Sequence, residues 1–329
     1  MSDLYQQQLL QQLSDGSFHS GEELAKLLGV SRTAVWKTIE SLRNSFHLQI
    51  HAVQGRGYRL ASPLELLDAG KITAALSMQQ RRMLGQLQIS ISVDSTNSHL
   101  KQQMLEGIDS GSACLSEYQS AGRGRRGRSW VSPFGCNLYL SLYWRFERSM
   151  TEVGGVSIAV GSVIAKVLSE QTANVALKWP NDVLIDGKKI AGILVDVQGA
   201  ADGPVDAVIG IGVNLDLPEH ASQQIDQPWT DLQQQGNEPV SRNQFAARML
   251  GELLQAMQLF QHHQLAAFIP RWRQYDLYHG EQVTLYHPRR KIRGIHKGIS
   301  DDGSLLLEVN GKICTFQSGE VSLRGGGDE

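Results

Sequence analysis

The chain has 329 residues, of which 41% are hydrophobic and 19% are charged, as in a globular protein large enough for two or three domains. Its 31 Lys and Arg against 33 Asp and Glu give a formal charge of -2, which excludes a polycation and restricts any nucleic-acid contact to a local patch. The three cysteines are odd in number and lack the spacing of metal ligands, which favours a reducing cytoplasm and no structural metal: Cys114, Cys136 and Cys314.

Two further segments bear on the location of the protein. The start, MSDLYQQQLLQQL, lacks a basic stretch followed by an apolar one, so we expect no signal peptide. The most apolar helix candidate, residues 153–168, contains Lys166 and is shorter than the roughly 20 residues that cross a bilayer. We therefore expect a cytoplasmic protein without a membrane partner, in which this helix belongs to the core.

Residues 1–62 predict three helices followed by a β-hairpin. Ser20 and Glu23 fit a capping box, and Ser31 can begin the third helix. With the hairpin formed by LQIHAV, QGRG and YRL, the segment resembles the winged helix-turn-helix family, whose partner is duplex DNA. We expect DNA contacts from the third helix and the hairpin tip, namely Arg32, Thr33, Trp36, Lys37, Arg43 and Arg56. The alternative is a three-helix protein-interaction module with solvated charges.

A cluster of polar residues follows the next strand candidate, LQISISV. The strand runs directly into Asp94, Ser95, Thr96 and Asn97, after which a helical pattern begins. Four cap-forming residues exceed what one helix start requires, so the spare hydroxyls and amide can bind a polar group of a ligand, such as a urea or an amide. The alternative is a helix cap and nothing more.

An arginine-rich loop, GRGRRGRSW, spans Gly122 to Trp130 between strand candidates 113–119 and 137–144. A buried guanidinium costs several kcal/mol unless it is paired, so this segment must be a loop. Its glycines allow close backbone approach, and its arginines suit phosphate or carboxylate. The loop predicts an anion site that becomes ordered around its ligand; a solvated basic loop and a nucleic-acid contact are the alternatives. Neither a P-loop nor a dinucleotide fingerprint is present.

Further candidates lie in the second half of the central region. Lys178 directly precedes WPND, where a proline and two turn formers favour a lysine held beside a cavity, although a lysine in a strand is more often a solvated edge residue. The strand AVIGIGVNLD carries Gly210 and Gly212, where missing side chains leave room for a ligand, and it ends at Asn214. Trp229, in the polar stretch 218–240, is either a plug over the core or a lid that stacks on a base.

The remaining patterns complete the architecture. Residues 153–170 and 243–275 predict helices that pack on the central sheet. From residue 277 the apolar period is two, which predicts about five short strands and a small SH3-like barrel.

Five motifs occur in one order along the chain: VDSTN, GRGRRGR, KWPNDV, GIGVN and SGEVSLR. Together they resemble the bifunctional biotin-protein ligase and biotin-operon repressor family, and the resemblance covers nearly the whole chain. It implies an α+β fold in three parts. These are a winged helix-turn-helix DNA-binding domain (1–62), a catalytic biotin/ATP-binding domain (63–276) whose mixed β-sheet carries helices on one face, and an SH3-like C-terminal domain (277–329).

The resemblance also implies a two-step reaction. Biotin and ATP, with Mg²⁺ accompanying ATP, would give biotinyl-5'-AMP, from which biotin passes to a lysine of the biotin carboxyl carrier protein of acetyl-CoA carboxylase. With adenylate bound, the protein would form a homodimer and repress the biotin biosynthesis operon by binding its operator DNA. We expect the hairpin of VLI and KKIAGILVDV at a sheet edge, where strand pairing between two copies would form that dimer.

Carried over by motif, the resemblance assigns the site residues, with Lys178 and Arg125 as catalytic residues and no metal ligand. Biotin would be bound by Ser95, Thr96, Asn97, Gln119, Gly122, Arg123, Gly124, Arg125, Lys178, Gly192 and Gly210. The nucleotide would be bound by Arg125, Arg126, Arg128, Lys178, Asn214, Trp229 and Arg324. Two alternatives stay open: a lipoate or octanoate ligase of similar fold, and a biotin-sensing repressor without catalysis.

Overall fold

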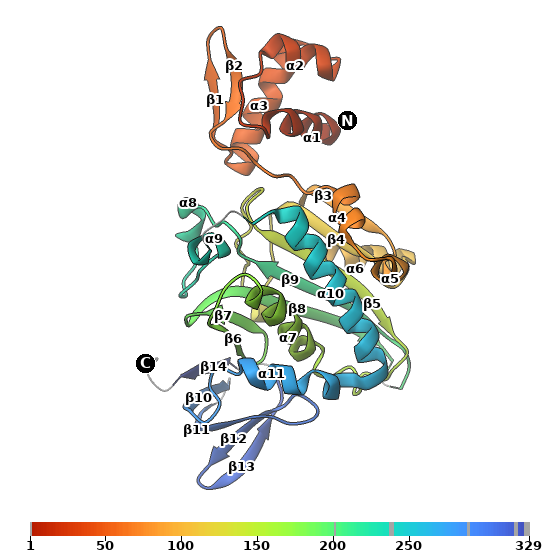
Figure 1. Cartoon of the computed structure of the whole chain (residues 1–329), viewed down its shortest axis with the longest axis vertical. Coiled ribbons are helices and arrows are strands. Elements are labelled where there is room, and N and C mark those ends of the chain that lie inside the picture. The colour runs from red at the N-terminus through yellow and green to blue at the C-terminus, as the bar shows by residue number, and fades with distance from the viewer. Residues whose placement is uncertain (1, 201, 237–239, 288–289, 319–321, 326–329) are drawn as a thin grey trace.

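The structure is a computed structural model that describes residues 2–200, 202–236, 240–287, 290–318 and 322–325. Three groups of elements follow one another along the long axis: a winged domain, a large sheet with its helices, and a C-terminal group of strands (Figure 1). This confirms the predicted α+β architecture. Residues 319–321 of the SGEVSLR motif lie outside the described residues.

The winged domain has the predicted order of helices and hairpin. Its elements are α1 (Ser2–Leu13), α2 (Gly21–Leu28), α3 (Arg32–Phe46), β1 (Ile50–Val53) and β2 (Gly57–Leu60). The Ser20 side chain accepts a hydrogen bond from Glu23 N, and the Glu23 carboxylate accepts one from Ser20 N, so the predicted capping box is confirmed. His19 pairs with Tyr58 through two backbone hydrogen bonds of 2.9 and 2.8 Å, which ties the segment before α2 to the hairpin.

The central sheet has seven strands in the order β3-β4-β5-β9-β8-β7-β6. β3 and β4 are parallel and the other neighbours are antiparallel, so the sheet is mixed as predicted. The strands are β3 (Leu87–Val93), β4 (Ala113–Gln119), β5 (Leu138–Phe146), β6 (Val175–Lys178), β7 (Asp182–Ile185), β8 (Lys188–Gly199) and β9 (Val205–Val213).

The position of the β7–β8 hairpin differs from the expectation. The expectation placed this hairpin at a sheet edge, whereas the edge strand is β6 and both hairpin strands are internal. β7 is short, however, and pairs with β8 only as far as Gly192. The rest of β8, up to Gly199, pairs with β9 on one side, and no other strand among the described residues pairs with its second side. Within the described hairpin, therefore, the overhanging half of β8 is the part that has an unpaired edge.

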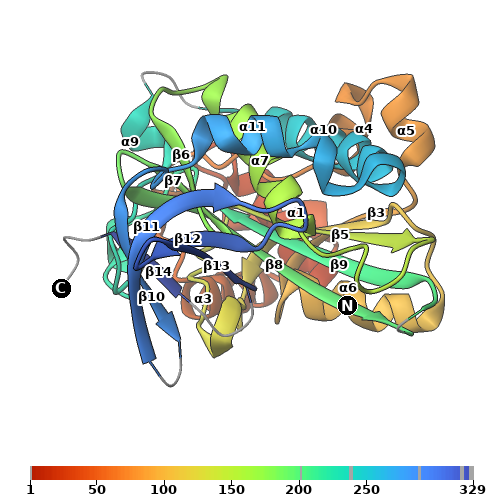
Figure 2. The ribbon, with the colours of Figure 1, turned by 90° about the horizontal axis from the view of Figure 1, so that it is seen from below.

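Helices cover both faces of the sheet. The larger layer contains α7 (Val156–Ser169) and α10 (Arg242–His263), as predicted. The two short helices that follow α10 belong to the same layer: η2 (Gln264–Ala267) and α11 (Ile269–Tyr275). α6 (Thr96–Glu106) packs on the opposite face, a location that the expectation of one covered face did not include (Figure 2). The remaining helices are α4 (Ala69–Ala75), α5 (Met78–Met83), η1 (Arg125–Gly127), α8 (Glu219–Ser222) and α9 (Leu232–Gln235).

The C-terminal strands form one antiparallel sheet in the order β13-β12-β11-β10-β14. They are β10 (Gln282–His287), β11 (Arg290–Ile299), β12 (Leu305–Val309), β13 (Lys312–Phe316) and β14 (Ser322–Gly325), which agrees with the predicted small barrel of about five strands. Backbone pairing of Asp276 with Leu177 attaches the start of this group to β6. None of the described helices combines the length and the apolar character needed to cross a bilayer.

Candidate functional site

Strand register brings the predicted site residues onto one face of the sheet, the face covered by α6. One row across the sheet contains Ser141, Gly210 and Leu194, which are directly opposite one another in β5, β9 and β8. The next row contains Gly212, Gly192, Asp182 and Lys178 and extends through β7 to β6. Because directly paired residues point to the same face, Lys178 shares a face with the glycines.

A chain of buried polar side chains lies at the start of α6. Ser141 Oγ is 2.8 Å from Thr96 Oγ1 and 2.6 Å from Asn97 Oδ1. Gln119 Oε1 accepts from Thr96 N at 2.9 Å, and Gln119 Nε2 donates to Ser132 Oγ at 2.9 Å. Ser95 precedes this chain at the N-cap but makes no capping bond through its side chain. The polar residues therefore do not serve as a simple helix cap. This argues against the alternative that residues 94–97, the DSTN segment, form a helix cap and nothing more.

The glycines of β8 and β9 leave room, but protein side chains occupy it. A Cβ on Gly210 would lie 2.1 Å from Asn97 Oδ1, and a Cβ on Gly212 would lie 2.4 Å from the Trp130 ring. Trp130, at the end of the arginine loop, also lies over Gly192. The cavity enclosed by these residues measures about 40 Å³, which is space for about one water molecule. The expected room for a ligand exists only if Trp130 moves.

The arginine loop, Gly122–Trp130, closes one side of a cleft of about 1100 Å³. The opposite side of the cleft is formed by the start of α7, residues 180–181 and the overhanging half of β8. Arg125 Nη1 donates to Asn181 Oδ1 at 2.9 Å, and Arg125 also contacts the carbonyl of Ser318 in the C-terminal group. Arg126 has a positive φ of 58°, a conformation that a residue with a side chain seldom adopts.

The electrostatics of the loop and of the adjacent strands favour an anion. Burial lowers the pKa of Arg125, the nearby Asp182 carboxylate opposes this shift, and Arg126 adds to it; an arginine in a protein nevertheless stays charged. Asp182 itself forms an ion pair of 2.7 Å with Lys189. Gly122, Gly124 and Arg128 line the same cleft. The described residues that line this cleft include no carboxylate but four arginines, which give it a positive surplus: Arg123, Arg125, Arg126 and Arg128.

A second cavity, of about 370 Å³, lies on the other side of the loop. Arg128, Asn214 and Trp229 line it together with Trp130 and Lys189, so three of the predicted nucleotide residues do meet. Asn214 Nδ2 donates to the carbonyl of Thr230, which fixes the segment that carries Trp229. Trp229 lines an open cavity and does not plug the core, so the lid interpretation is favoured.

Arg324 is separate from this cavity. It is exposed on β14, with its guanidinium 5.0 Å from the centre of the Tyr286 ring. The described residues that line the second cavity include none from the C-terminal strands.

Several residues of the site were not predicted from the sequence. Ser141 and Ser132 complete the polar chain, and Asp196 Oδ2 accepts from Asn97 Nδ2 at 3.3 Å and from Arg123 Nη1 at 3.2 Å. Trp130 was seen only as the end of the loop. A usable signal existed for Ser141, because it is the one small polar residue among the apolar and aromatic residues 138–144. Nothing local singled out Asp196.

The proposed DNA surface of the winged domain is partly changed by the structure. Arg32, Thr33, Trp36 and Lys37 are exposed along α3, and Arg56 is exposed at the hairpin tip. Arg43 differs, since its guanidinium bonds Glu40 at 2.6 Å and the carbonyl of Ile50 at 3.0 Å. These bonds attach the end of α3 to β1 and take Arg43 out of the set that can reach DNA.

Phe18 organises the tip of the hairpin. The guanidinium carbons of Arg56 and Arg59 lie 4.3 and 4.9 Å from the centre of its ring. Such contacts are attractive because the ring face is electron-rich. Phe18 therefore holds two cations side by side at the hairpin, and neither it nor Arg59 was predicted from the sequence.

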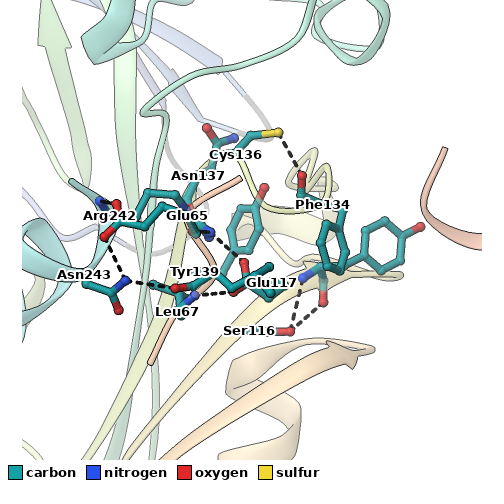
Figure 3. Close-up of polar contacts among 12 residues, drawn as sticks. Glu65, Leu67, Ser116, Glu117, Phe134, Cys136, Asn137, Tyr139, Arg242 and Asn243 are labelled. Atoms are coloured by element: carbon teal, nitrogen blue, oxygen red, sulfur yellow. Dashed lines mark hydrogen bonds and ion pairs between the residues drawn. The ribbon is translucent and has the colours of Figure 1, made fainter. Parts of the chain in front are cut away.

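The segment that joins the winged domain to the sheet is fixed by a polar network (Figure 3). Glu65 accepts from the backbone N of Arg242 at 2.6 Å and from Asn243 Nδ2 at 2.9 Å. Arg242 in turn forms a 2.7 Å ion pair with Glu117, with side-chain exposures of only 7% and 4%. Removing one partner of such a pair leaves an unpaired buried charge and costs about 3–5 kcal/mol.

Aromatic contacts join the end of α3 to the segments that form the pocket. The Phe46 ring lies 4.8 Å from that of Phe134 and 5.2 Å from that of Tyr118. Tyr118 directly precedes Gln119, and Phe134 follows Ser132 by two residues. The winged domain thus contacts the same two segments that supply the polar chain.

Two of the three cysteines, Cys114 and Cys136, are largely buried. Burial raises the pKa of Cys114 and of Cys136 to about 12, so neither is a thiolate near neutral pH. Within the described parts of the chain, no cluster of three His, Cys, Asp or Glu side chains is placed to hold a metal ion.

Comparisons with known families define the class of protein first. The model of the biotin/lipoate A/B protein ligase family matches residues 89–214, which include the DSTN segment, the arginine loop and the glycine strands. A helix-turn-helix domain model matches residues 6–59, and the biotin protein ligase C-terminal domain model matches residues 278–324. A solved biotin protein ligase from Aquifex aeolicus, in complex with biotin and ATP, superposes with a TM-score of 0.61 at 28% identity, covering 73% of this chain and 99% of that one.

Whole-length relatives narrow the class. The bifunctional ligase/repressor BirA of Salmonella typhimurium is 41% identical over 96% of this chain and 96% of its own length. The Escherichia coli protein of the same name is 40% identical with the same coverage, and that of Bacillus subtilis is 29% identical over 93% of this chain and 94% of its own length. This chain belongs to the family of bifunctional ligase/repressor proteins.

Proposed function

We propose that the protein is an ATP-dependent biotin-protein ligase that also acts as a biotin-operon repressor. The observation that carries this proposal is the polar chain of Thr96, Asn97, Ser141 and Gln119, buried directly beneath the arginine loop. It offers both donors and acceptors to a ureido group at the closed end of a pocket. Leu194 and Trp130 add apolar surface to this pocket, which suits an aliphatic chain that leads toward the cations.

The first chemical step joins two anions, so the chain must neutralise both. The biotin carboxylate attacks the α-phosphate of MgATP, and pyrophosphate leaves as biotinyl-5'-AMP forms. Lys178, on the pocket face of β6, would place a compact positive charge between carboxylate and phosphate, and Arg125 would add a second, forked donor. Arg126, Arg128, Asn214 and Trp229 would serve the nucleotide, with Mg²⁺ arriving on its phosphates. Arg324 would join them only through movement of the C-terminal strands.

The second step needs no nucleophile from the protein. The adenylate is already an activated acyl donor, and the amine of an acceptor lysine attacks its carbonyl while AMP leaves. The chain's task is to exclude water from this mixed anhydride until the acceptor arrives. Ordering of Gly122 to Trp130 over the ligand would supply that exclusion, and the cleft of about 1100 Å³ would admit the acceptor side chain. We assign the biotin carboxyl carrier protein of acetyl-CoA carboxylase as this acceptor.

The Lys178→Ala variant tests the ligase proposal. We expect biotin-dependent exchange of pyrophosphate into ATP to fall about 10²- to 10³-fold, because a preorganised cation at the reacting phosphate is lost. Lys188→Ala is the matched control, since Lys188 is an exposed lysine on the neighbouring hairpin. Compared without biotin and ATP, both variants should bind duplex DNA as the unaltered chain does, because the winged domain is not altered. Exchange at the normal rate in Lys178→Ala refutes the assignment of this lysine.

Repression follows from the winged domain and the overhanging half of β8. Exposed residues of α3 and the hairpin tip would contact operator DNA, with affinity that falls steeply as salt rises. The unpaired side of β8, residues 194–199, lies beside the arginine loop and would pair with a second copy to give a two-fold dimer. A ligand that orders the loop would then promote dimerisation and operator binding. These activities place the protein in the cytoplasm.

Two alternatives are less well supported. A lipoate or octanoate ligase would meet a buried chain of hydroxyls and amides where its alkyl chain requires apolar walls. Competition between biotin and lipoate in pyrophosphate exchange separates these substrates. A repressor that binds biotin without catalysis has no need of Lys178 and Arg125 in their present positions, and transfer of labelled biotin to a carrier domain excludes it.

A further inference from the structure

Asp196 connects the arginine loop to the polar chain of the pocket. Its carboxylate oxygen Oδ2 accepts from Arg123 Nη1 at 3.2 Å and from Asn97 Nδ2 at 3.3 Å. Its position in β8 is two residues beyond Leu194, so both side chains point to the pocket face. One carboxylate therefore contacts the first arginine of the loop and an amide at the closed end of the pocket.

The far end of the loop is bonded to the same chain. Ser132 Oγ accepts from Gln119 Nε2 and donates to the carbonyl of Trp130, at 2.9 Å in each case. Gln119 connects through Thr96 to Ser141, and Ser141 connects to Asn97. A continuous series of hydrogen bonds thus runs from Arg123, through Asp196 and the pocket, to Trp130.

We propose that Asp196 is a positioning residue that holds the loop closed over the bound adenylate and fixes the orientation of the Asn97 amide. The inference rests on the proposed function, because it names the residue that controls retention of that reaction's intermediate. With Nδ2 of Asn97 held by Asp196 and by the carbonyl of Leu194, Oδ1 is left toward Ser141 and the pocket. The same carboxylate forms an ion pair with Arg123, so it partly neutralises the first arginine of the loop.

Asp196→Asn removes the charge but keeps the size of the side chain. The side chains of Asp196 and Arg123 are 21% and 46% exposed, so solvent weakens the pair and a moderate effect is expected. We expect preformed, labelled biotinyl-5'-AMP to dissociate from the full-length variant about 3- to 10-fold faster than from the unaltered chain. Asp196→Glu, which keeps the charge, should restore most of the retention.

The fold provides a closely matched control. Asp206 pairs with Arg145 at 3.3 Å with side-chain exposures of 22% and 47%, in the adjacent strand β9 but away from the loop. Asp206→Asn should leave the dissociation rate within a factor of two of normal. A general loss of sheet stability would affect both variants, whereas loss of the loop contact affects Asp196→Asn alone.

The double variant Asp196→Asn/Arg123→Gln gives a second test. If the two side chains act as one unit, its effect on the dissociation rate of the adenylate should differ from the sum of the effects of the two single substitutions. Dissociation from Asp196→Asn at the normal rate, or equally fast dissociation from Asp206→Asn, overturns the inference. Because the adenylate is supplied preformed, failure of the unaltered chain to synthesise it counts against the proposed function alone. Failure of the unaltered chain to bind it overturns both.

Discussion

At the scale of single residues, Gly210 is the site glycine that leaves the least room for a side chain, because the Asn97 amide lies against it. A methyl group at residue 210 would lie 2.1 Å from Asn97 Oδ1, so the amide must turn away from Ser141. We expect Gly210→Ala to raise the KM for biotin about 10- to 100-fold in pyrophosphate exchange, through overpacking and lost hydrogen bonds. The KM for ATP should change little.

A glycine elsewhere in the same domain serves as the control for that prediction. Gly161 lies within α7, where an added Cβ would meet its neighbours at 3.5 Å, an ordinary contact distance. Gly161→Ala should leave both KM values unchanged, because alanine suits a helix better than glycine does. An unaltered KM for biotin in Gly210→Ala would contradict the placement of the ligand against Asn97.

The sequence predicted local structure correctly where a run of residues would be energetically costly in any other conformation or environment. Arginines and glycines in alternation excluded a buried segment, and four cap formers in a row exceeded the needs of one helix. The sequence could not identify Asp196, because its contacts with Asn97 and Arg123 join residues 99 and 73 positions away in the chain. The fate of Arg43 was unpredictable for the same reason, since its bond to Ile50 depends on how the hairpin folds back on α3.

At the scale of elements, Phe18 is expected to control the hairpin of the winged domain. Each exposed contact between a guanidinium and an aromatic face is worth about 0.5–1 kcal/mol, and Phe18 makes two. We expect Phe18→Leu to weaken binding of the adenylate-loaded chain to a biotin-promoter fragment about 5- to 30-fold. The slope of affinity against salt should also become shallower, because fewer phosphates are contacted.

Phe18→Tyr is the control, because tyrosine changes the side chain but keeps the aromatic face that contacts the two guanidinium groups. This variant should bind DNA nearly as the unaltered chain does, and both variants should retain pyrophosphate exchange. Equal DNA affinity of Phe18→Leu and the unaltered chain would show that Arg56 and Arg59 do not need the contact with the Phe18 ring in order to bind DNA.

Element boundaries were predicted well where periodicity and caps agree. β3 and β4 have the expected bounds, and the expected hairpin of VLI and KKIAGILVDV forms as β7 and β8. The order of strands was not predictable, because pairing depends on contacts between segments distant in sequence. The overhang of β8 is an example: its length is visible in the sequence, but the shortness of its neighbour β7 matters only after the two are paired.

At the scale of the whole molecule, ligand pocket, interdomain contact and candidate dimer edge share the same few segments. β4 contributes Gln119 to the pocket, Tyr118 to the contact with Phe46, and Glu117 to the ion pair with Arg242 that anchors the connecting segment. The cleft beside the arginine loop includes the overhanging half of β8. The winged domain is thus fixed to the strand that carries Gln119. If the proposed ligand binds there, the structural change has only a short distance to travel to the winged domain and to the edge of β8.

The exposed edge of β8 gives the last prediction. Val197 lies on that edge with 45% of its surface exposed. In a dimer formed by pairing of two copies of this strand, lysines at residue 197 would place like charges near the strand pair and destabilise it. We expect Val197→Lys to weaken dimerisation of the adenylate-bound chain at least about 10-fold in sedimentation experiments. Pyrophosphate exchange on the same sample shows whether the ligand site is intact.

Ile313→Lys is the control, because Ile313 is 58% exposed on β13, the edge strand of the C-terminal sheet. It adds the same charge to a different edge and should leave the dimer unchanged. If Val197→Lys dimerises normally while Ile313→Lys does not, the interface lies on the C-terminal strands, and the link from the ordered loop to the operator must run through them. Operator affinity should follow dimerisation in either case, since two winged domains on one two-fold axis are needed to span a palindromic site.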